Sequence, residues 1–431
     1  MRRIAGSGLL LVGSVWGCQL PGGGNGGDDP SATAATSDTD GSGPSTSPDV
    51  ETEDAGSSSG EPAGGGGSGG VSPGDATVIP LDLDFTPLSL ELGDFDGDGH
   101  VDLLVTGVQS TVVRSATLLG FGDGTFAAPL DNGLVGCSAY PVVGRLSDDA
   151  RDDVLVAGCN GHPVTALVAA ANATLSPWSI WPDVDAIGVR SSVIADLEGD
   201  GDGDVMSVRV NDDFFEHVLA IDLFESNGGT GFWAGGTSSL GNVAQSGFDP
   251  NALVAGHFDD DVVLDVALVD QGHDVVRLIG GPPPSAFAFP LELGVALSPW
   301  AALVGDLDDD GLDEIVVTSN DEGAAQVQHA VGGGNFEGDA VLDLGGASPY
   351  AATLGDVDGD GSLDLVTVDD AVASVHWWPG DGAGGFGAPA QRSLPSPAIR
   401  VHTADLDEDG QHDIIAATYD DESITLLLSG G

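Results

Sequence analysis

An acidic loop recurs seven times along this chain, each time between two short hydrophobic runs. In its cleanest form the loop carries aspartate at its first, third, fifth and ninth positions and glycine at its sixth, as from Asp94 to Asp102 and from Asp356 to Asp364. Loops that begin at Asp196, Asp306 and Asp405 keep this pattern with small changes. A segment of this composition cannot lie in a hydrophobic core, so the loops must connect buried elements at a surface.

The loops follow one another at a nearly constant spacing. Their first positions are 51, 51, 61, 49, 50 and 49 residues apart, counting two degenerate copies that begin at Arg145 and His257. A period of this size indicates stacked supersecondary units, each too small to bury its own hydrophobic face.

Each period predicts four short strands. In the fifth unit these are Ala301 to Val304, Ile315 to Thr318, Ala325 to Val331 and Ala340 to Leu344, with a glycine-rich turn holding Phe336 before the last. Four antiparallel strands in about 40 to 50 residues are typical of a β-propeller blade. The sequence therefore predicts an all-β fold, a seven-bladed β-propeller.

The two ends of the repeat region complement each other. After the seventh loop only two strand-like runs remain, Ile414 to Thr418 and Ile424 to Ser429. An additional run, Val78 to Asp84, precedes the first loop, and its Pro80 to Leu83 matches the fourth-strand segment Pro290 to Leu293. We expect the N-terminal strand to complete the last blade, because that arrangement closes the ring without a long exposed edge.

The loop chemistry indicates Ca²⁺. This hard cation takes six to eight oxygen ligands, and alternate carboxylates converge on it only if glycine allows a tight curl. An EF-hand would need its last acid at position twelve and flanking helices, whereas here it stands at position nine before a β-rich run. The alternative is a solvated acidic turn without metal. The predicted ligands, with the seventh residue of each loop contributing its backbone carbonyl, are Asp94, Asp96, Asp98, His100 and Asp102; Asp196, Glu198, Asp200, Asp202 and Asp204; Asp306, Asp308, Asp310, Leu312 and Glu314; Asp356, Asp358, Asp360, Ser362 and Asp364; and Asp405, Asp407, Asp409, Gln411 and Asp413.

The two degenerate loops are predicted to bind calcium weakly or not at all. In the second, Arg145 replaces the first acid, and its guanidinium is a candidate substitute for the ion. In the fourth, His257 is a poor ligand for a hard cation and Val262 replaces the turn glycine, although Asp259, Asp261 and Asp265 remain.

These units resemble FG-GAP/VCBS-type repeats, the calcium-loop propeller repeats also found in integrin α-subunit heads. The glycine-rich aromatic turns Phe121 to Phe126, Gly333 to Phe336 and Gly380 to Phe386 carry the resemblance, together with the loop signature from Gly93 to Gly99. The resemblance implies the propeller fold and calcium. It does not imply one function, because such propellers serve in adhesion, in lectin-like binding and as lyase scaffolds.

The N-terminus predicts export. Arg2 and Arg3 precede an apolar stretch from Leu9 to Val15 that is too short to span a bilayer, and Cys18 ends a candidate cleavage box. Residues 1–18 resemble a bacterial lipoprotein signal with Cys18 as the lipidated residue; an ordinary cleaved secretory signal is the alternative. Residues 19–74 are rich in Gly, Ser and Asp and predict a disordered tether to the propeller at 75–431.

The charge balance narrows the class of partner. The chain has 69 acidic residues against 10 basic ones, a net charge of −59. Nucleic acid is excluded as a partner because its phosphates require a basic surface.

Outside the predicted signal peptide the only cysteines of the sequence are Cys137 and Cys159. They flank the second loop and are expected at similar positions along the two strands that the loop connects. They predict a disulfide, with buried free thiols as the alternative.

The functional prediction is a monomeric, non-enzymatic binding or adhesion module for glycans or proteins, held at the bacterial envelope by its lipid. Trp300 and Tyr350 each precede their loop by six residues, and Tyr140 precedes its loop by five, so they are expected at the end opposite the calcium loops. Trp178, Trp181, Trp377 and Trp378 add candidate aromatic surface, although packing between blades is the commoner use. The alternative is a secreted polysaccharide lyase or hydrolase, since an active site built from several blades leaves no local motif. Gly56 to Gly60 fits a nucleophile elbow only formally, because no strand or helix surrounds it.

Overall fold

The computed structural model describes residues 77–81, 83–110, 112–133, 141–156, 164–180, 188–197, 203–213, 216–226, 232–242, 250–279, 291–339, 341–345, 349–418 and 423–430. The chain divides into two compact units, one of Met1–Gln19 with Gly70–Gly431 and the other of Leu20–Gly69. All described residues belong to the first unit. They include no helix with the length and hydrophobicity of a membrane span.

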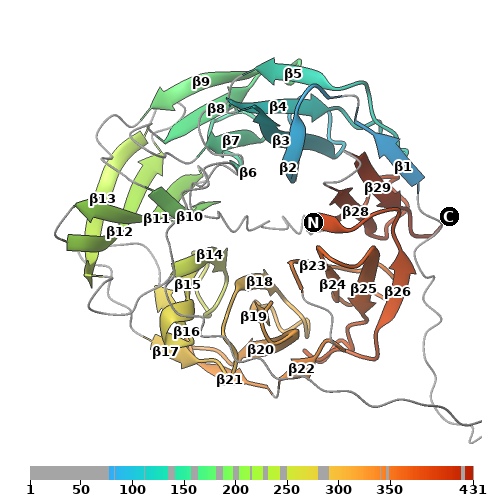
Figure 1. The fold of residues 1–431 in the computed structure, drawn as a ribbon. Helices are drawn as coiled ribbons and strands as arrows, with labels where there is room; N and C mark the ends of the chain where they lie inside the picture. Colours follow the sequence, from blue (N-terminus) through green and yellow to red (C-terminus); the bar gives the residue numbers. More distant parts are fainter. Residues whose placement is uncertain are drawn as a thin grey trace, which may run out of the picture. The chain divides into compact units, whose positions relative to one another are not determined.

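The described residues form seven antiparallel sheets (Figure 1). In chain order the strands are β2 (Thr86–Gly93), β3 (Asp102–Gln109), β4 (Val112–Leu118) and β5 (Leu130–Gly133); β6 (Pro141–Gly144), β7 (Asp153–Val156), β8 (Thr165–Ala169) and β9 (Leu175–Ile180); β10 (Gly188–Ala195), β11 (Asp204–Asp213), β12 (Glu216–Ser226) and β13 (Phe232–Asn242); β14 (Pro250–Gly256), β15 (Asp265–Asp270), β16 (Val275–Ile279) and β17 (Leu291–Gly294); β18 (Ala301–Gly305), β19 (Glu314–Ser319), β20 (Ala324–Ala330), β21 (Phe336–Gly338) and β22 (Leu342–Asp343); β23 (Ala351–Gly355), β24 (Asp364–Val368), β25 (Ser374–Trp378) and β26 (Ala390–Ser393); and β27 (Ala398–Ala404), β28 (Asp413–Thr418), β29 (Ser423–Leu427) and β1 (Thr77–Pro80).

The first strands of the sheets contact one another in sequence. Contacts run from β2 through β6, β10, β14, β18 and β23 to β27, and β27 in turn contacts β2. Figure 1 shows β2, β6, β10, β14, β18 and β23 innermost, with the later strands of each sheet farther out. The predicted all-β propeller is confirmed.

The N-terminal strand completes the last sheet, as predicted. β1 pairs with β29 in the order β1-β29-β28-β27, with Thr77 opposite Leu426 and Pro80 opposite Ser423. The strand ends at Pro80 rather than continuing to Asp84. Beyond it, Leu81 and Phe85 enter the core between this sheet and the β2 sheet, so the chain has turned away from β29.

The core lies between neighbouring sheets rather than on one side of each. One hydrophobic cluster joins Leu90 and Val105 of the first repeat to Ile415 and Leu426 of the last. The middle strands β19 and β28 are therefore buried along their whole length. Burial on both faces explains why the sequence shows continuous hydrophobic runs here instead of alternation.

The fourth strand of the fifth repeat differs from the prediction. Instead of one strand from Ala340 to Leu344, β20 pairs with β21 and then separately with β22. The chain enters the sheet early because Phe336, the first residue of β21, packs edge-on against Phe258 of the preceding repeat with 5.8 Å between ring centroids.

Candidate metal centres

Loops one, five, six and seven, the intact loops that are described throughout, each curl around the carboxylate of their first residue. In loop one, Asp94 Oδ1 accepts hydrogen bonds from the backbone N–H groups of Gly97 and Asp98, and Asp94 Oδ2 accepts one from Gly99 at 3.0 Å. Loop six repeats this pattern around Asp356. The curl brings the side chains that follow back toward the same point.

Glycine at the sixth position makes this curl possible. The φ angles of Gly99 and Gly361 are +92° and +93°, in the left-handed region that other residues adopt only with strain. The glycine predicted from the loop pattern is therefore required by the backbone and not only tolerated.

The curled loops place carboxylates close enough to share a cation. Ligand oxygens lie within 4.8 Å of one another in four groups of three residues, which are Asp94, Asp96 and Asp102; Asp306, Asp308 and Asp310; Asp356, Asp358 and Asp360; and Asp405, Asp407 and Asp413. Their donor atoms are all carboxylate oxygens, the ligands that Ca²⁺ prefers. In addition, Asp306 Oδ1 and Asp407 Oδ1 are buried and have no hydrogen-bond partner. These donor sets fit a hard divalent cation.

Burial and crowding both raise the pKa values of the third-position acids Asp96 and Asp358. Burial is the larger cause for Asp96 and Asp358, and the neighbouring charges of Asp98 and Asp360 raise their pKa values further. A bound cation would offset both effects, because it favours the charged carboxylate.

The fifth and seventh positions are linked within loops one, five, six and seven. His100 N donates to Asp98 Oδ1 at 2.9 Å, and Leu312, Ser362 and Gln411 donate in the same way to the fifth-position aspartate of their loops. It stays a prediction that the seventh-position carbonyls and the side chains of Asp98 and Asp409 are metal ligands.

The ninth carboxylate has a structural role that the loop pattern does not reveal. Asp364 Oδ2 accepts a hydrogen bond from Val357 N at 2.9 Å, and its Oδ1 accepts one from Gly380 N at 2.8 Å. Asp102 and Asp413 make the equivalent pairs of bonds. This residue therefore ties the start of the loop to the end of the third strand. Burial raises its pKa to about 6 for Asp102 and to about 7 for Asp364 and Asp413.

The third loop is described only at its ends. Asp196 is described, and Asp204 Oδ2 accepts a hydrogen bond from Leu197 N at 3.0 Å, as in the other loops. Glu198, Asp200 and Asp202 lie outside the described residues. The same holds for Cys18, Cys137 and Cys159, so lipidation and the disulfide stay predictions.

The repeat sequence and the fold both have counterparts among known proteins. A sequence profile described as "FG-GAP-like repeat" matches residues 306–367 and 356–416, which contain loops five, six and seven. The protein is a β-propeller that contains FG-GAP-like repeats. Comparison with curated proteins gives no match.

Solved structures support the fold of this FG-GAP propeller. One, described as BBS1N in complex with ARL6DN soaked with lead, has a TM-score of 0.53 at 11% identity and covers 84% of this chain and 98% of its own. Another, described as a protein from Lactobacillus plantarum, has a TM-score of 0.50 at 16% identity and covers 73% of this chain and 86% of its own. At these identities the likeness shows the fold alone.

The second FG-GAP loop holds a cation of its own, but it is not the one expected. Arg145 is exposed, whereas the Arg151 guanidinium pairs with Asp149 and donates from Nε to Ala169 O at 2.9 Å. Arg151 occupies the seventh position of the loop and Arg145 the first. Asp153 keeps the ninth-position bonds, accepting from Ser147 N at 2.7 Å and from Ala169 N at 2.9 Å.

The fourth FG-GAP loop retains only part of the pattern. Asp259 and Asp261 accept hydrogen bonds from backbone N–H groups two residues later, and Val262 is 88% exposed. No group of three candidate ligands occurs in this loop within residues 250–279, the part that is described.

Neighbouring FG-GAP loops are hydrogen-bonded to each other through the eighth position. Asp94 N donates to Asp152 Oδ2 at 2.9 Å, and Asp152 N donates to Asp94 O at 2.8 Å. No sequence pattern predicts these bonds, because the residue at the eighth position differs from loop to loop. Equivalent bonds run from His257 N to Asp313 Oδ2, from Asp313 N to His257 O and from His412 N to Asp356 O.

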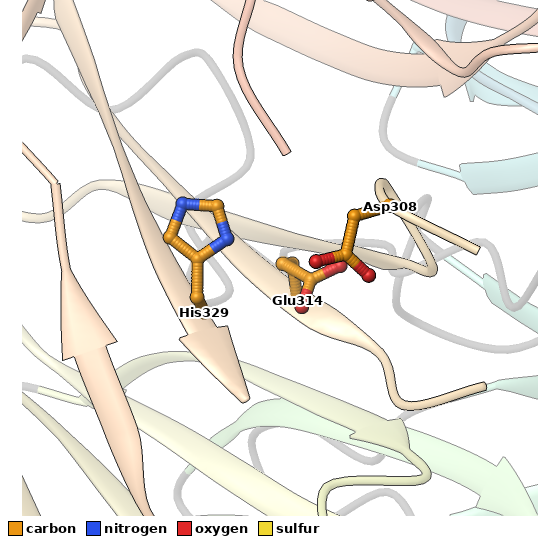
Figure 2. A group of neighbouring side chains, drawn as sticks. All are labelled: Asp308, Glu314 and His329. Carbon is orange, nitrogen blue, oxygen red and sulfur yellow. The ribbon is translucent and has the colours of Figure 1, made fainter. Parts of the chain in front are cut away.

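Loop five has a neighbour that the loop pattern could not predict. His329, on β20, lies beside Asp308 and Glu314, and these three residues form a further group with ligand atoms within 4.8 Å (Figure 2). Glu314 is fully buried, and burial raises its pKa to about 7.

The predicted aromatic surface is only partly present. Trp300 and Tyr350 are half-buried, but Trp377 and Trp378 are 3% and 1% exposed and belong to the cores between repeats. The prediction for these two tryptophans was wrong because β25 is buried on both faces. Trp178 packs against a third core, and Tyr140 and Trp181 lie outside the described residues.

Proposed function

We propose that this FG-GAP propeller is a calcium-stabilised binding module that presents a glycan or protein ligand surface at the end opposite its acidic loops. The observation that carries the proposal is the placement of Trp300 and Tyr350. Each donates its backbone N–H to the adjacent strand, Trp300 to Thr318 O at 2.8 Å and Tyr350 to Val368 O at 3.0 Å. They therefore occupy the same register position in two repeats.

The two repeats are neighbours. Trp300 immediately precedes β18 and Tyr350 immediately precedes β23, and these innermost strands contact each other. The acidic loops leave the other ends of the same strands, so the aromatic pair and the candidate metal ions occupy opposite faces. Half-buried aromatic rings held on a rigid scaffold offer stacking area at a low entropic cost, which suits sugar rings and peptide side chains.

The involvement of the acidic side chains in the loop structure also supports a binding role. The acidic groups that an acid/base mechanism would need are largely committed to loop geometry, as the bonds of Asp94 and Asp364 illustrate. The net charge of −59 further favours neutral ligands over acidic polysaccharides, because like charges repel.

Export and lipid anchoring at Cys18, with residues 19–74 as a flexible tether, complete the proposal. The N-terminal sequence pattern supports them, and millimolar extracellular calcium would fill sites of the affinity typical of such modules. Labelled-palmitate incorporation that disappears in Cys18→Ser would support anchoring, whereas label in both forms or in neither would contradict it.

A glycan and peptide array with the Cys18→Ser chain in 1 mM calcium tests the binding role. We expect retention of neutral glycans or of a peptide, and loss of at least tenfold in affinity in the Trp300→Ala/Tyr350→Ala double variant. Trp178→Ala is the matched control, because Trp178 packs against a core at another site. Cleavage of a retained polysaccharide, or binding unaffected by the double variant, would contradict the proposal.

A further inference from the structure

Repeat five departs from the other described repeats at two positions that face each other. Its ninth loop residue is Glu314, where loops one, six and seven have aspartate. Ile315 of β19 lies opposite Gln328 of β20. One residue farther along the same antiparallel pairing, Glu314 lies opposite His329. When the strand pairing is extended by one residue in loops one, six and seven, the residues opposite the ninth-position aspartates are Leu119, Pro379 and Leu428. An additional methylene on the acid and an imidazole in place of an apolar residue thus occur together.

The substitution leaves a buried oxygen without a partner. Glu314 Oε2 accepts a hydrogen bond from Leu307 N at 2.8 Å, as the equivalent aspartates do. Its Oε1 is buried and makes no well-formed hydrogen bond, although the Ala330 backbone lies near enough to lower its pKa slightly, and the residue as a whole is 0% exposed. A buried carboxylate oxygen that makes no hydrogen bond is costly, so a further ligand at this point would stabilise the fold.

His329 is oriented as a metal-ligating histidine would be. Figure 2 shows one ring nitrogen on the side of Asp308 and Glu314, and all three residues have ligand atoms within 4.8 Å of one another. The other ring nitrogen, Nε2, lies 3.2 Å from Asp339 Oδ2. A carboxylate on the distal nitrogen fixes the ring and its tautomer, an arrangement that most metal-bound histidines share.

We propose that Asp308, Glu314 and His329 form a Zn²⁺ site. Two carboxylates and one imidazole are a set of ligands typical of borderline divalent ions, whereas the hard Ca²⁺ takes oxygen. The two negative charges balance the ion, and the buried Oε1 gains a partner. Loop five then differs in metal from loops one, six and seven, and the inference stands independently of any glycan or peptide ligand.

Calorimetric titration of the Cys18→Ser chain with ZnCl₂ in 1 mM CaCl₂ tests this site. We expect a site whose affinity falls at least tenfold in His329→Leu, a change that reproduces Leu119 and Leu428 of other repeats. Glu314→Asp, which shortens the acid to the form in those repeats, should also weaken it. His376→Leu is the matched control, since His376 lies on the equivalent strand β25 and its Nε2 is 2.8 Å from Gln391 Oε1.

The variants must also be shown to fold. Unchanged calcium-dependent melting of His329→Leu separates loss of a ligand from loss of structure. Zinc affinity that is equal in the parent chain and in His329→Leu would overturn the proposal and leave His329 as a simple charge partner of the acids. Absence of zinc binding in the parent chain would overturn it equally.

Discussion

The ninth loop residue shows how one side chain can serve both the fold and an ion. Asp364 links Val357 to Gly380 through its two oxygens, and Asp153 makes the same kind of link in a loop where Arg151 supplies the positive charge. Because the link survives where the acids of the first and third positions have been lost, its structural role does not depend on the metal.

Substitution of this residue should therefore destabilise the protein with or without calcium. An amide can accept only one of the two backbone hydrogen bonds, so Asp364→Asn and Asp153→Asn should each cost about 1 to 3 kcal/mol in free energy of unfolding. Chemical denaturation in EDTA and in calcium measures this cost. Asp358→Ala is the contrast, because it should lower stability only when calcium is present; a calcium-dependent effect of Asp153→Asn would contradict the assignment.

The metal-free protein should lose stability as the pH rises. Asp102, Asp364, Asp413 and Glu91 have folded pKa values raised by burial to between about 6 and about 7, against about 4 when unfolded. A carboxyl with a raised folded pKa contributes fully below its unfolded pKa, and the contribution is lost as the pH rises through the folded value. Burial lowers the pKa of His402 to about 4 and also lowers that of His412, and these two described groups act in the opposite direction.

Melting temperatures in EDTA between pH 4.5 and 7.5 test this trend. The expected result is a steady fall, together with proton release when calcium binds near pH 6.5. Melting in EDTA that rises with pH would show that the buried carboxyls are not the dominant titrating groups.

Spacing was enough to predict where the acidic loops lie and which glycine permits their curl, because the hydrogen bonds of the curl are local. It could not identify Arg151 or His329. Arg151, rather than Arg145, pairs with Asp149 and contacts Ala169 O of the third strand, and His329 meets loop five only through the β19–β20 register. Both depend on contacts between segments, which a local pattern does not contain.

At the scale of elements, four short strands per repeat followed from the hydrophobic runs, and β1 followed from the missing fourth strand of the last repeat. The end of β1 at Pro80 and the division of the fourth strand into β21 and β22 did not. Both are set by side chains packing against another repeat, such as Phe336 on Phe258.

The pairing of β1 with β29 should contribute measurably to stability. Ile79 packs against the core shared by the first and last repeats, so Ile79→Ala should cost about 1 to 2 kcal/mol. Val78, next to it and 43% exposed, is the matched control, and Val78→Ala should change stability by less than about 0.5 kcal/mol. Equal effects of the two substitutions in urea denaturation would contradict the closure of the last sheet by this strand.

At the scale of the whole molecule, the acidic loops also join neighbouring repeats. The bonds between Asp94 and Asp152 and between His257 and Asp313 link consecutive loops, and His100 Nδ1 lies 2.6 Å from Glu408 Oε1 across the junction of the first and last repeats. Ions that hold the loops in shape would therefore stabilise the contacts between repeats as well as the hairpins themselves.

Calcium content and melting temperature, measured together on the full chain, test the central claim most directly. At about 1 mM calcium, sites with dissociation constants of about 0.1 to 1 mM contribute about 0.4 to 1.4 kcal/mol each. The account predicts several calcium ions per chain after equilibration at 1 mM, and a large fall in melting temperature when a chelator removes them. A chain that retains no calcium under these conditions, and melts at the same temperature with and without chelator, would contradict it.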